Sequence, residues 1–163
     1  MSTQKDWSSC PSTATWKYDV FLSFRGKDSR NSFVSHLYFA LKQKGILTFK
    51  DDVRLERGKP ISDLCEAIEE SKFAIVIFSR NYASSRWCLE ELAKIVECKK
   101  ETGMVVLPIF YKVDLSDIQI QRNIAQAFVK NKIRFKKNLK KVQRWKDALK
   151  EVANISGWHL QNR

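Results

Sequence analysis

The sequence predicts an α/β domain in which helices cover both faces of a central parallel sheet. Segments with strand-like and helix-like hydrophobic patterns alternate along the chain, and glycines stand between several of them. The strand-like segments are apolar at almost every position, as expected where both faces of a parallel sheet are covered. Strands and helices that alternate in this way imply right-handed crossover connections.

The composition fits one ordinary globular domain. The 163 residues are 44% hydrophobic and include 30 Lys and Arg against 18 Asp and Glu, for a formal net charge of +12. This apolar content is enough for a core in residues 16–163. Residues 1–15 are rich in Ser and Thr and lack the order of a signal peptide, so we expect a disordered lead-in. The longest apolar runs are far shorter than the ~20 residues that a membrane helix needs.

The first strand is predicted at residues 18–24, and a helix follows over about residues 30–44. Gly45 stands where a helix C-terminus favours the left-handed conformation, and residues 46–49 form a short second strand. The apolar positions of the helix are Phe33, Leu37, Ala40 and Leu41. Their helical spacing predicts an amphipathic helix.

A polar segment, residues 50–59, separates the second strand from the next helix. It is too long and too charged for a minimal turn, and long loops inside compact domains are often functional. Pro60 opens the next helix, residues 73–78 form the third strand, and a further helix ends at Gly103.

The last third of the chain is less regular. Residues 104–111 predict a fourth strand, in which Pro108 has no N–H for the ladder, so we expect a bulge or a local irregularity there. A polar loop, a helical region around residues 124–128 and a basic run precede a last helix and a fifth strand at residues 157–160. The apolar residues of the last helix are Val142, Trp145, Leu149 and Val152.

In open parallel sheets the ligand site lies beyond the carboxyl ends of the strands. The residues there argue against several chemistries, because they include no glycine-rich phosphate motif and no G-x-S-x-G elbow. Ser79 stands where a receiver domain has its phosphoacceptor aspartate. The four cysteines form no C-x-x-C pair, which favours reduced thiols in a cytosolic protein over disulfides or zinc, so we expect no metal.

The segment after the third strand is the most informative. On a helical wheel Trp87, Glu91 and Lys94 point nearly opposite the apolar face of their helix. In one interpretation Trp87 covers a neighbouring loop and Glu91 forms a surface ion pair with Lys94. In the other, Trp87 is a stacking wall for a planar ligand and Glu91 is aimed into a cleft, with Arg25 or Arg57 available for phosphates. The residues alone leave both interpretations open.

Four motifs in order match a known family. They read YDVFLSFRG at residues 18–26, FKDD leading to LERGK at residues 49–59, SRNYASSRWCLEEL at residues 79–92 and PIFYKVD at residues 108–114. Together they closely resemble the Toll/interleukin receptor (TIR) domain in its plant form, which commonly stands at the N-terminus of intracellular nucleotide-binding leucine-rich-repeat immune receptors. The resemblance implies a flavodoxin-like, three-layer α/β/α sandwich with a five-stranded parallel sheet.

The resemblance also implies an enzyme that hydrolyses NAD+ when several copies assemble, with NAD+ as the substrate and no cofactor. Glu91 corresponds to the catalytic glutamate of the family. Nicotinamide leaves as a neutral molecule, so no general acid is needed, and Glu91 would stabilise the oxocarbenium-like ribose. The implied substrate-binding residues are Phe24, Arg25, Gly26, Arg30, Ser85, Trp87 and Cys88.

Self-association is the second implication of the resemblance. The implied contact residues lie in the polar loop, on the first helix and on the last helix: Ser35, His36, Arg57, Gly58, Lys59 and Trp145. For His36, a satisfied histidine beside the core face of its helix is an equal alternative. We expect homodimers to tetramers, contacts with other TIR-containing receptors, and a cytoplasmic location, with the nucleus as a second compartment. The signalling outcome implied is a defence response and cell death.

Two positions depart from the family pattern. Lys27 stands where relatives have Glu, which reverses a charge beside the presumed nucleotide cleft, and Leu115 replaces a proline.

Residues 130–150 hold ten Lys and Arg against one acid, Asp147. Such a basic region would suit binding to nucleic acid, although few aromatic residues are interleaved in it. The alternatives to the enzyme are therefore a non-catalytic scaffold and a domain that binds or hydrolyses nucleic acid.

Overall fold

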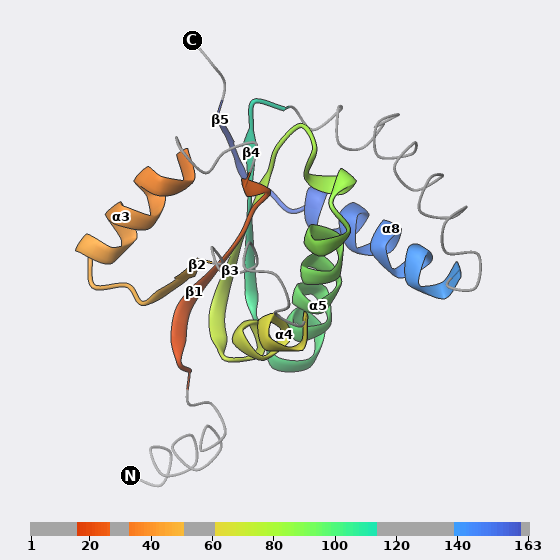
Figure 1. Cartoon of the computed structure of the whole chain (residues 1–163), viewed down its shortest axis with the longest axis horizontal. Coiled ribbons are helices and arrows are strands. Elements are labelled where there is room, and N and C mark those ends of the chain that lie inside the picture. The colour runs from red at the N-terminus through yellow and green to blue at the C-terminus, as the bar shows by residue number, and fades with distance from the viewer. Residues whose placement is uncertain (1–15, 27–32, 51–60, 114–138, 161–163) are drawn as a thin grey trace, which may run out of the picture.

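The computed structural model describes residues 16–26, 33–50, 61–113 and 139–160. Within these ranges the chain forms a parallel sheet of five strands in the order β2-β1-β3-β4-β5 (Figure 1). The strands are β1 (Tyr18–Ser23), β2 (Thr48–Lys50), β3 (Ser71–Phe78), β4 (Val105–Tyr111) and β5 (Trp158–Leu160). The predicted α/β class and the flavodoxin-like five-stranded parallel sheet are thus confirmed.

The described helices cover both faces of the sheet. Helix α3 (Ser35–Gln43) lies on one face, and α4 (Ile61–Glu69), α5 (Arg86–Thr102) and α8 (Leu139–Ala153) lie together on the other (Figure 1). The larger cluster of buried apolar side chains lies under α4, α5 and α8, and a smaller one lies on the α3 face. Burial on both faces explains why the central strands are apolar at almost every position.

Helix α5 begins and ends where its sequence dictates. The Ser85 hydroxyl accepts a hydrogen bond from the backbone N–H of Cys88 at 3.2 Å, which caps the first turn. Gly103 follows the last turn with a φ of 75°, a left-handed conformation that glycine adopts without strain. The first turn of α5 reaches the carboxyl end of β1, where Cys88 Sγ lies 3.6 Å from the carbonyl oxygen of Phe24.

Helix α3 differs from its prediction. None of the residues within α3 is buried, Ala40 is exposed, and Leu37 and Leu41 are half-buried against the smaller cluster. Val34, just before the helix, is fully buried instead. The predicted apolar face is therefore wrong at Ala40, because the helix packs Leu37, Tyr38 and Leu41 on the smaller cluster and leaves Ala40 on its exposed side. Gly45 has the left-handed conformation that was predicted, with a φ of 77°.

The irregularity expected at Pro108 is absent. Residues 105 to 110 pair one to one with residues 73 to 78 of β3, and Pro108 stands opposite Val76. Strand β5 begins to pair with β4 at Ile109, so Pro108 lies at the start of that ladder, where a missing N–H is tolerated. The prediction of a bulge is wrong for this reason.

Several predicted segments lie outside the described residues. These are the N-terminal lead-in, the polar loop at 51–59 and the helical region around 124–128. Among the described residues, no helix combines the length and the apolar character that crossing a bilayer requires.

Candidate functional site

The candidate site lies where the strand order changes direction. The chain runs from β1 outward to β2 and then returns to the other side of β1 to form β3, so β1 and β3 are neighbours at a topological switch point. In open parallel sheets, ligands bind beyond the carboxyl ends of the strands at such a point. Ser23 ends β1, and a short 3-10 helix, η4 (Tyr82–Ser84), and the N-terminus of α5 follow the end of β3.

Glu91 lies in the second turn of α5 and is 1% exposed. Its Oε1 accepts a hydrogen bond from the Ser23 hydroxyl at 2.8 Å. The helical wheel placed this carboxylate opposite the buried face, which is wrong because α5 is buried by the sheet and by the neighbouring helices α4 and α8. The alternative of a surface ion pair between Glu91 and Lys94 is also wrong, since Lys94 contacts Glu69 and Glu97.

Tyr82 extends the polar contacts of Glu91 behind Ser23. Its hydroxyl lies 2.7 Å from Ser23 Oγ and 3.3 Å from the carbonyl oxygen of Cys88, to which it is placed to donate. The Tyr82 side chain is 1% exposed, and its ring packs edge-on against Phe78. The carboxylate is therefore connected to β1, η4 and the first turn of α5. Sequence reasoning did not single out Ser23 or Tyr82.

Trp87 lies one turn before Glu91 on α5. It is half-buried and packs against the larger core cluster, which fits the interpretation in which it covers neighbouring structure. Its indole N–H is buried and has no hydrogen-bond partner among the residues that the structure describes. Trp87 therefore brings a buried donor to the same end of α5 as the carboxylate.

The structure brings part of the predicted substrate-binding set together. Phe24 is buried directly after β1, and its carbonyl oxygen lies 3.6 Å from Cys88 Sγ. Ser85 caps α5 through the N–H of the same Cys88. Arg25 and Gly26 follow Phe24 and are half-buried, and Arg30 lies outside the described residues, as do Lys27 and Leu115.

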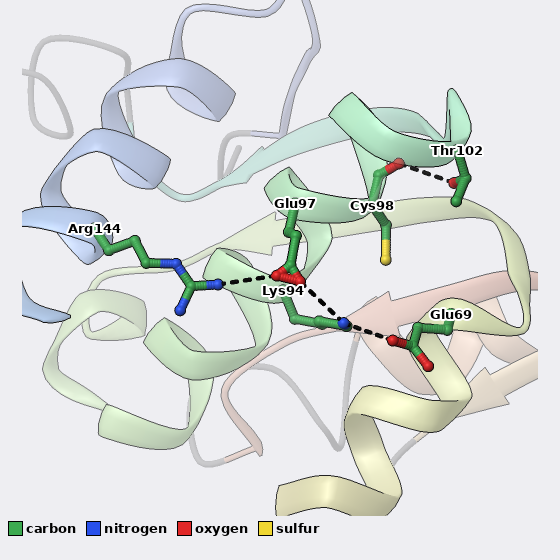
Figure 2. A network of polar contacts seen from close by, with 6 residues as sticks. All are labelled: Glu69, Lys94, Glu97, Cys98, Thr102 and Arg144. Carbon is green, nitrogen blue, oxygen red and sulfur yellow. Dashed lines mark hydrogen bonds and ion pairs between the residues drawn. The ribbon is translucent and has the colours of Figure 1, made fainter.

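An ion-pair network joins the three helices on this face (Figure 2). Lys94 Nζ lies 2.6 Å from Glu69 Oε2 on α4 and 3.1 Å from Glu97 Oε1, and Glu97 Oε2 contacts Arg144 of α8 at 3.4 Å. Partial burial alone would lower the pKa of the Lys94 ammonium, but the hydrogen bonds that it donates to Glu69 and Glu97 outweigh burial, and the pKa is raised. The network links α5 to α4 and α8 by ion pairs at the partly exposed rim of this face.

The sequence model of the TIR domain family matches residues 17–163. The chain belongs to the TIR domain family. This confirms the resemblance that the four motifs indicated. The candidate site therefore lies beyond the carboxyl ends of β1 and β3 in a TIR domain. Glu91 stands four residues after Trp87 in the motif.

Curated plant proteins are similar to this TIR domain along most of its length. The TMV resistance protein N of Nicotiana glutinosa is 54% identical over 152 residues, which are 92% of this chain and 13% of that protein. Disease resistance protein RPV1 of Vitis rotundifolia is 51% identical over 162 residues, which are 98% of this chain and 11% of that protein. The chain thus spans about an eighth of the length of the curated relatives that it matches.

Among solved structures, the TIR domains in the structure of the activated Roq1 resistosome directly recognising the pathogen effector XopQ are similar to this chain. The TM-score is 0.79 and the sequence identity is 53%, and the match covers 90% of this chain and 89% of that one. At 53% identity the likeness covers the sequence as well as the fold.

The residues implied in self-association of the TIR domain fall into three groups. Ser35 is half-buried and His36 is exposed on α3. Arg57, Gly58 and Lys59 lie outside the described residues. Trp145 is 1% exposed, and its indole N–H donates to Glu90 Oε1 at 3.2 Å, so the prediction that this side chain contacts a second copy is wrong. Trp145 belongs to the core because its large ring fills the space between α8 and α5.

Proposed function

We propose that this TIR domain is the signalling domain of a plant immune receptor and that it hydrolyses NAD+ to nicotinamide and ADP-ribose-type nucleotides. The observation that supports this best is the Glu91 carboxylate, which is held by Ser23 at the topological switch point of the sheet. Binding of a nucleotide at this edge follows the general rule for open parallel sheets. NAD+ is a substrate in this proposal and not a resident cofactor.

The proposed reaction needs one carboxylate. The glycosidic bond between nicotinamide nitrogen and ribose C1′ breaks, and its electron pair neutralises the cationic pyridinium, so nicotinamide leaves without protonation. The positive charge that develops on the ribose is stabilised by the Glu91 carboxylate, whose charge acts strongly in a site removed from bulk water. Water then adds to C1′ and releases a proton. Trp87 stacks on the planar part of the substrate in this proposal.

Burial of Glu91 supports activity that depends on assembly. At 1% exposure in the single chain, the carboxylate is covered, so a ribose reaches it only after structure around α5 moves. We propose that contacts with further copies, from dimer to tetramer, supply this change. The similarity to TIR domains of an activated resistosome supports self-association. Other TIR-containing receptors are proposed as further partners, with a cytoplasmic location that extends to the nucleus.

An exposed face of α3 is the proposed surface for one of these contacts. His36 and Phe39 lie three residues apart on α3, and Phe39 is 60% exposed. An exposed aromatic ring beside a histidine offers both apolar area and a hydrogen-bonding group, which are common at protein interfaces.

The test is nicotinamide release from NAD+ by the purified domain at high concentration and when fused to an oligomerising module. We expect Glu91→Gln to lose at least about a hundredfold in rate, because the stabilising charge is removed while the side-chain volume is kept. Glu101→Gln, an exposed acid at the other end of α5, is the matched control and keeps wild-type activity. Equal rates for wild type and Glu91→Gln, or a silent wild type in the fused form, would favour the non-catalytic scaffold.

The nucleic-acid alternative has a separate test. Lys141 and Arg144 on α8 pair with Glu90 and Glu97 of α5, which engages part of the basic surface within the domain. Salt-sensitive retention on DNA or RNA that is lost on neutralising the exposed Lys140 and Lys146 would favour that alternative.

A further inference from the structure

We propose that Ser23 and Tyr82 are positioning residues that hold the Glu91 carboxylate in one orientation at the end of β1. This inference rests on the proposed NAD+ hydrolysis, for which Glu91 is the catalytic residue. Both side chains lie within the motifs but had no role in the sequence analysis, and the inference explains why hydroxyl groups are buried at these positions.

The three side chains form a chain of hydrogen bonds with a defined direction. The Ser23 hydroxyl has one proton, which it donates to Glu91 Oε1 at 2.8 Å. Its oxygen is then an acceptor for the Tyr82 hydroxyl at 2.7 Å. The Tyr82 proton is shared with the carbonyl oxygen of Cys88, which lies farther away at 3.3 Å. The direction of donation therefore runs from Tyr82 through Ser23 to the carboxylate.

Burial makes this chain important to the orientation of Glu91. Ser23 is 0% exposed, and Tyr82 and Glu91 are each 1% exposed. Hydrogen bonds are electrostatically stronger in such surroundings than in water, and a buried polar group that loses its partner is costly. The carboxylate therefore keeps its hydrogen bond to Ser23, and rotation about the side chain of Glu91 is restricted.

The chain also joins three separate elements. Ser23 is the last residue of β1, Tyr82 is the first residue of η4, and Glu91 belongs to α5. Ser23 is 59 residues from Tyr82 in the sequence and 68 residues from Glu91. The hydrogen bonds thus fix the height of α5 above the sheet edge as well as the rotamer of Glu91. Catalytic groups need placement to within about 0.5 Å, and hydrogen bonds from separate elements are one means of achieving it.

Ser71 provides a matched control for Ser23. It is also 0% exposed and lies at the start of β3, at the opposite end of the sheet, where its hydroxyl donates to the carbonyl oxygen of Ala67 at 2.7 Å. Ser71→Ala therefore removes a buried serine hydroxyl with no contact to the candidate site. Tyr82→Phe removes the outer hydroxyl of the chain and keeps the ring that packs on Phe78.

The experiment measures kcat and KM for nicotinamide release by the assembled domain. We expect Ser23→Ala to lower kcat by about tenfold or more with KM within about twofold, since misplacement of a catalytic group acts on the transition state. Tyr82→Phe lowers kcat by a smaller factor, and Ser71→Ala leaves kcat unchanged. Equal kcat losses in Ser23→Ala and Ser71→Ala, or a loss in KM alone, would overturn the positioning role.

A second measurement does not depend on enzyme activity. Urea unfolding of wild type, Ser23→Ala, Glu91→Gln and the double variant forms a double-mutant cycle. We expect the two substitutions to be non-additive, and additive effects would overturn the proposal. The proposed function itself is contradicted if the wild type releases no nicotinamide or if Glu91→Gln releases it as fast as the wild type. The unfolding cycle reports on the Ser23–Glu91 contact without activity, so it distinguishes that failure from the absence of the contact.

Discussion

Three residues at the N-terminus of α5 have different structural tasks. Ser85 caps the helix, Trp87 packs on the core and Glu91 is buried against Ser23. Their positions in the motif identified them as candidates from the sequence. The orientation of Glu91 was not predictable in the same way, because a helical wheel assumes one buried face and α5 has eight buried residues.

A cysteine beside the ion-pair network links stability to pH. Burial raises the pKa of the Cys98 thiol from 9.0 to about 11. The positive charge of Lys94 lowers this pKa in part, and the negative charges of Glu69 and Glu97 raise it further. The folded chain therefore holds this proton more tightly than the unfolded chain. The resulting stability is complete below about pH 9 and is lost as the pH rises toward 11.

We expect this thiol to contribute on the order of 2–3 kcal/mol to the fall in the free energy of unfolding between pH 9 and pH 11. The measurement is urea unfolding with a reductant, in wild type and in Cys98→Ala. The fall should be smaller in the variant, because other groups that titrate in this range are common to both proteins. Parallel pH profiles would show that Cys98 does not titrate as described.

At the scale of elements, the edge between β4 and β5 depends on a close backbone approach. A Cβ atom added at Gly157 would lie 2.2 Å from the carbonyl oxygen of Pro108 and 2.8 Å from its ring. Such distances are far below van der Waals contact, and a backbone oxygen cannot move aside as a flexible side chain does. Glycine at position 157 therefore allows the short strand β5 to pair with β4.

Gly157→Ala should destabilise the domain by about 1–3 kcal/mol, the usual cost of forcing extra volume into a packed site. Thermal or urea unfolding measures the effect. Ser156→Ala changes the exposed preceding residue and serves as the control, with a change within about 0.5 kcal/mol. Equal stability of Gly157→Ala and wild type would mean that β5 moves away from β4 without cost.

At the scale of the whole molecule, the proposed function requires several copies. His36 and Phe39 are exposed on α3, and α3 lies on the opposite face of the sheet from α5 (Figure 1). A contact through α3 therefore does not cover the helix that holds Glu91. The proposed self-association through α3 would therefore leave the proposed substrate site on the other side of the sheet uncovered.

His36→Glu should weaken self-association by about tenfold, equal to about 1.4 kcal/mol, because a symmetric contact would bring two negative charges together. Sedimentation velocity over a range of concentrations measures the association, and nicotinamide release should fall in parallel. Gln43→Glu adds the same charge at an exposed position near the end of α3 and is the control. Unchanged association of His36→Glu would exclude this face of α3 as the contact.

The sequence by itself determined the order of the elements, the parallel sheet and the family. Apolar strands and the glycine after α5, Gly103, are local features, so periodicity and capping rules identify them without knowledge of the rest of the chain. The expectations for Ala40 and Pro108 failed because each depends on how much of a neighbouring element covers it.

Only the tertiary structure decided what surrounds Glu91. Its partner Ser23 is 68 residues away in the chain, and the one available signal was a polar residue after the apolar run Val20–Leu22. Likewise, the pairing of Lys94 with Glu69 and Glu97 follows from the packing of α4 against α5. Local patterns carry no information on such contacts, because they arise when the sheet register brings distant residues together.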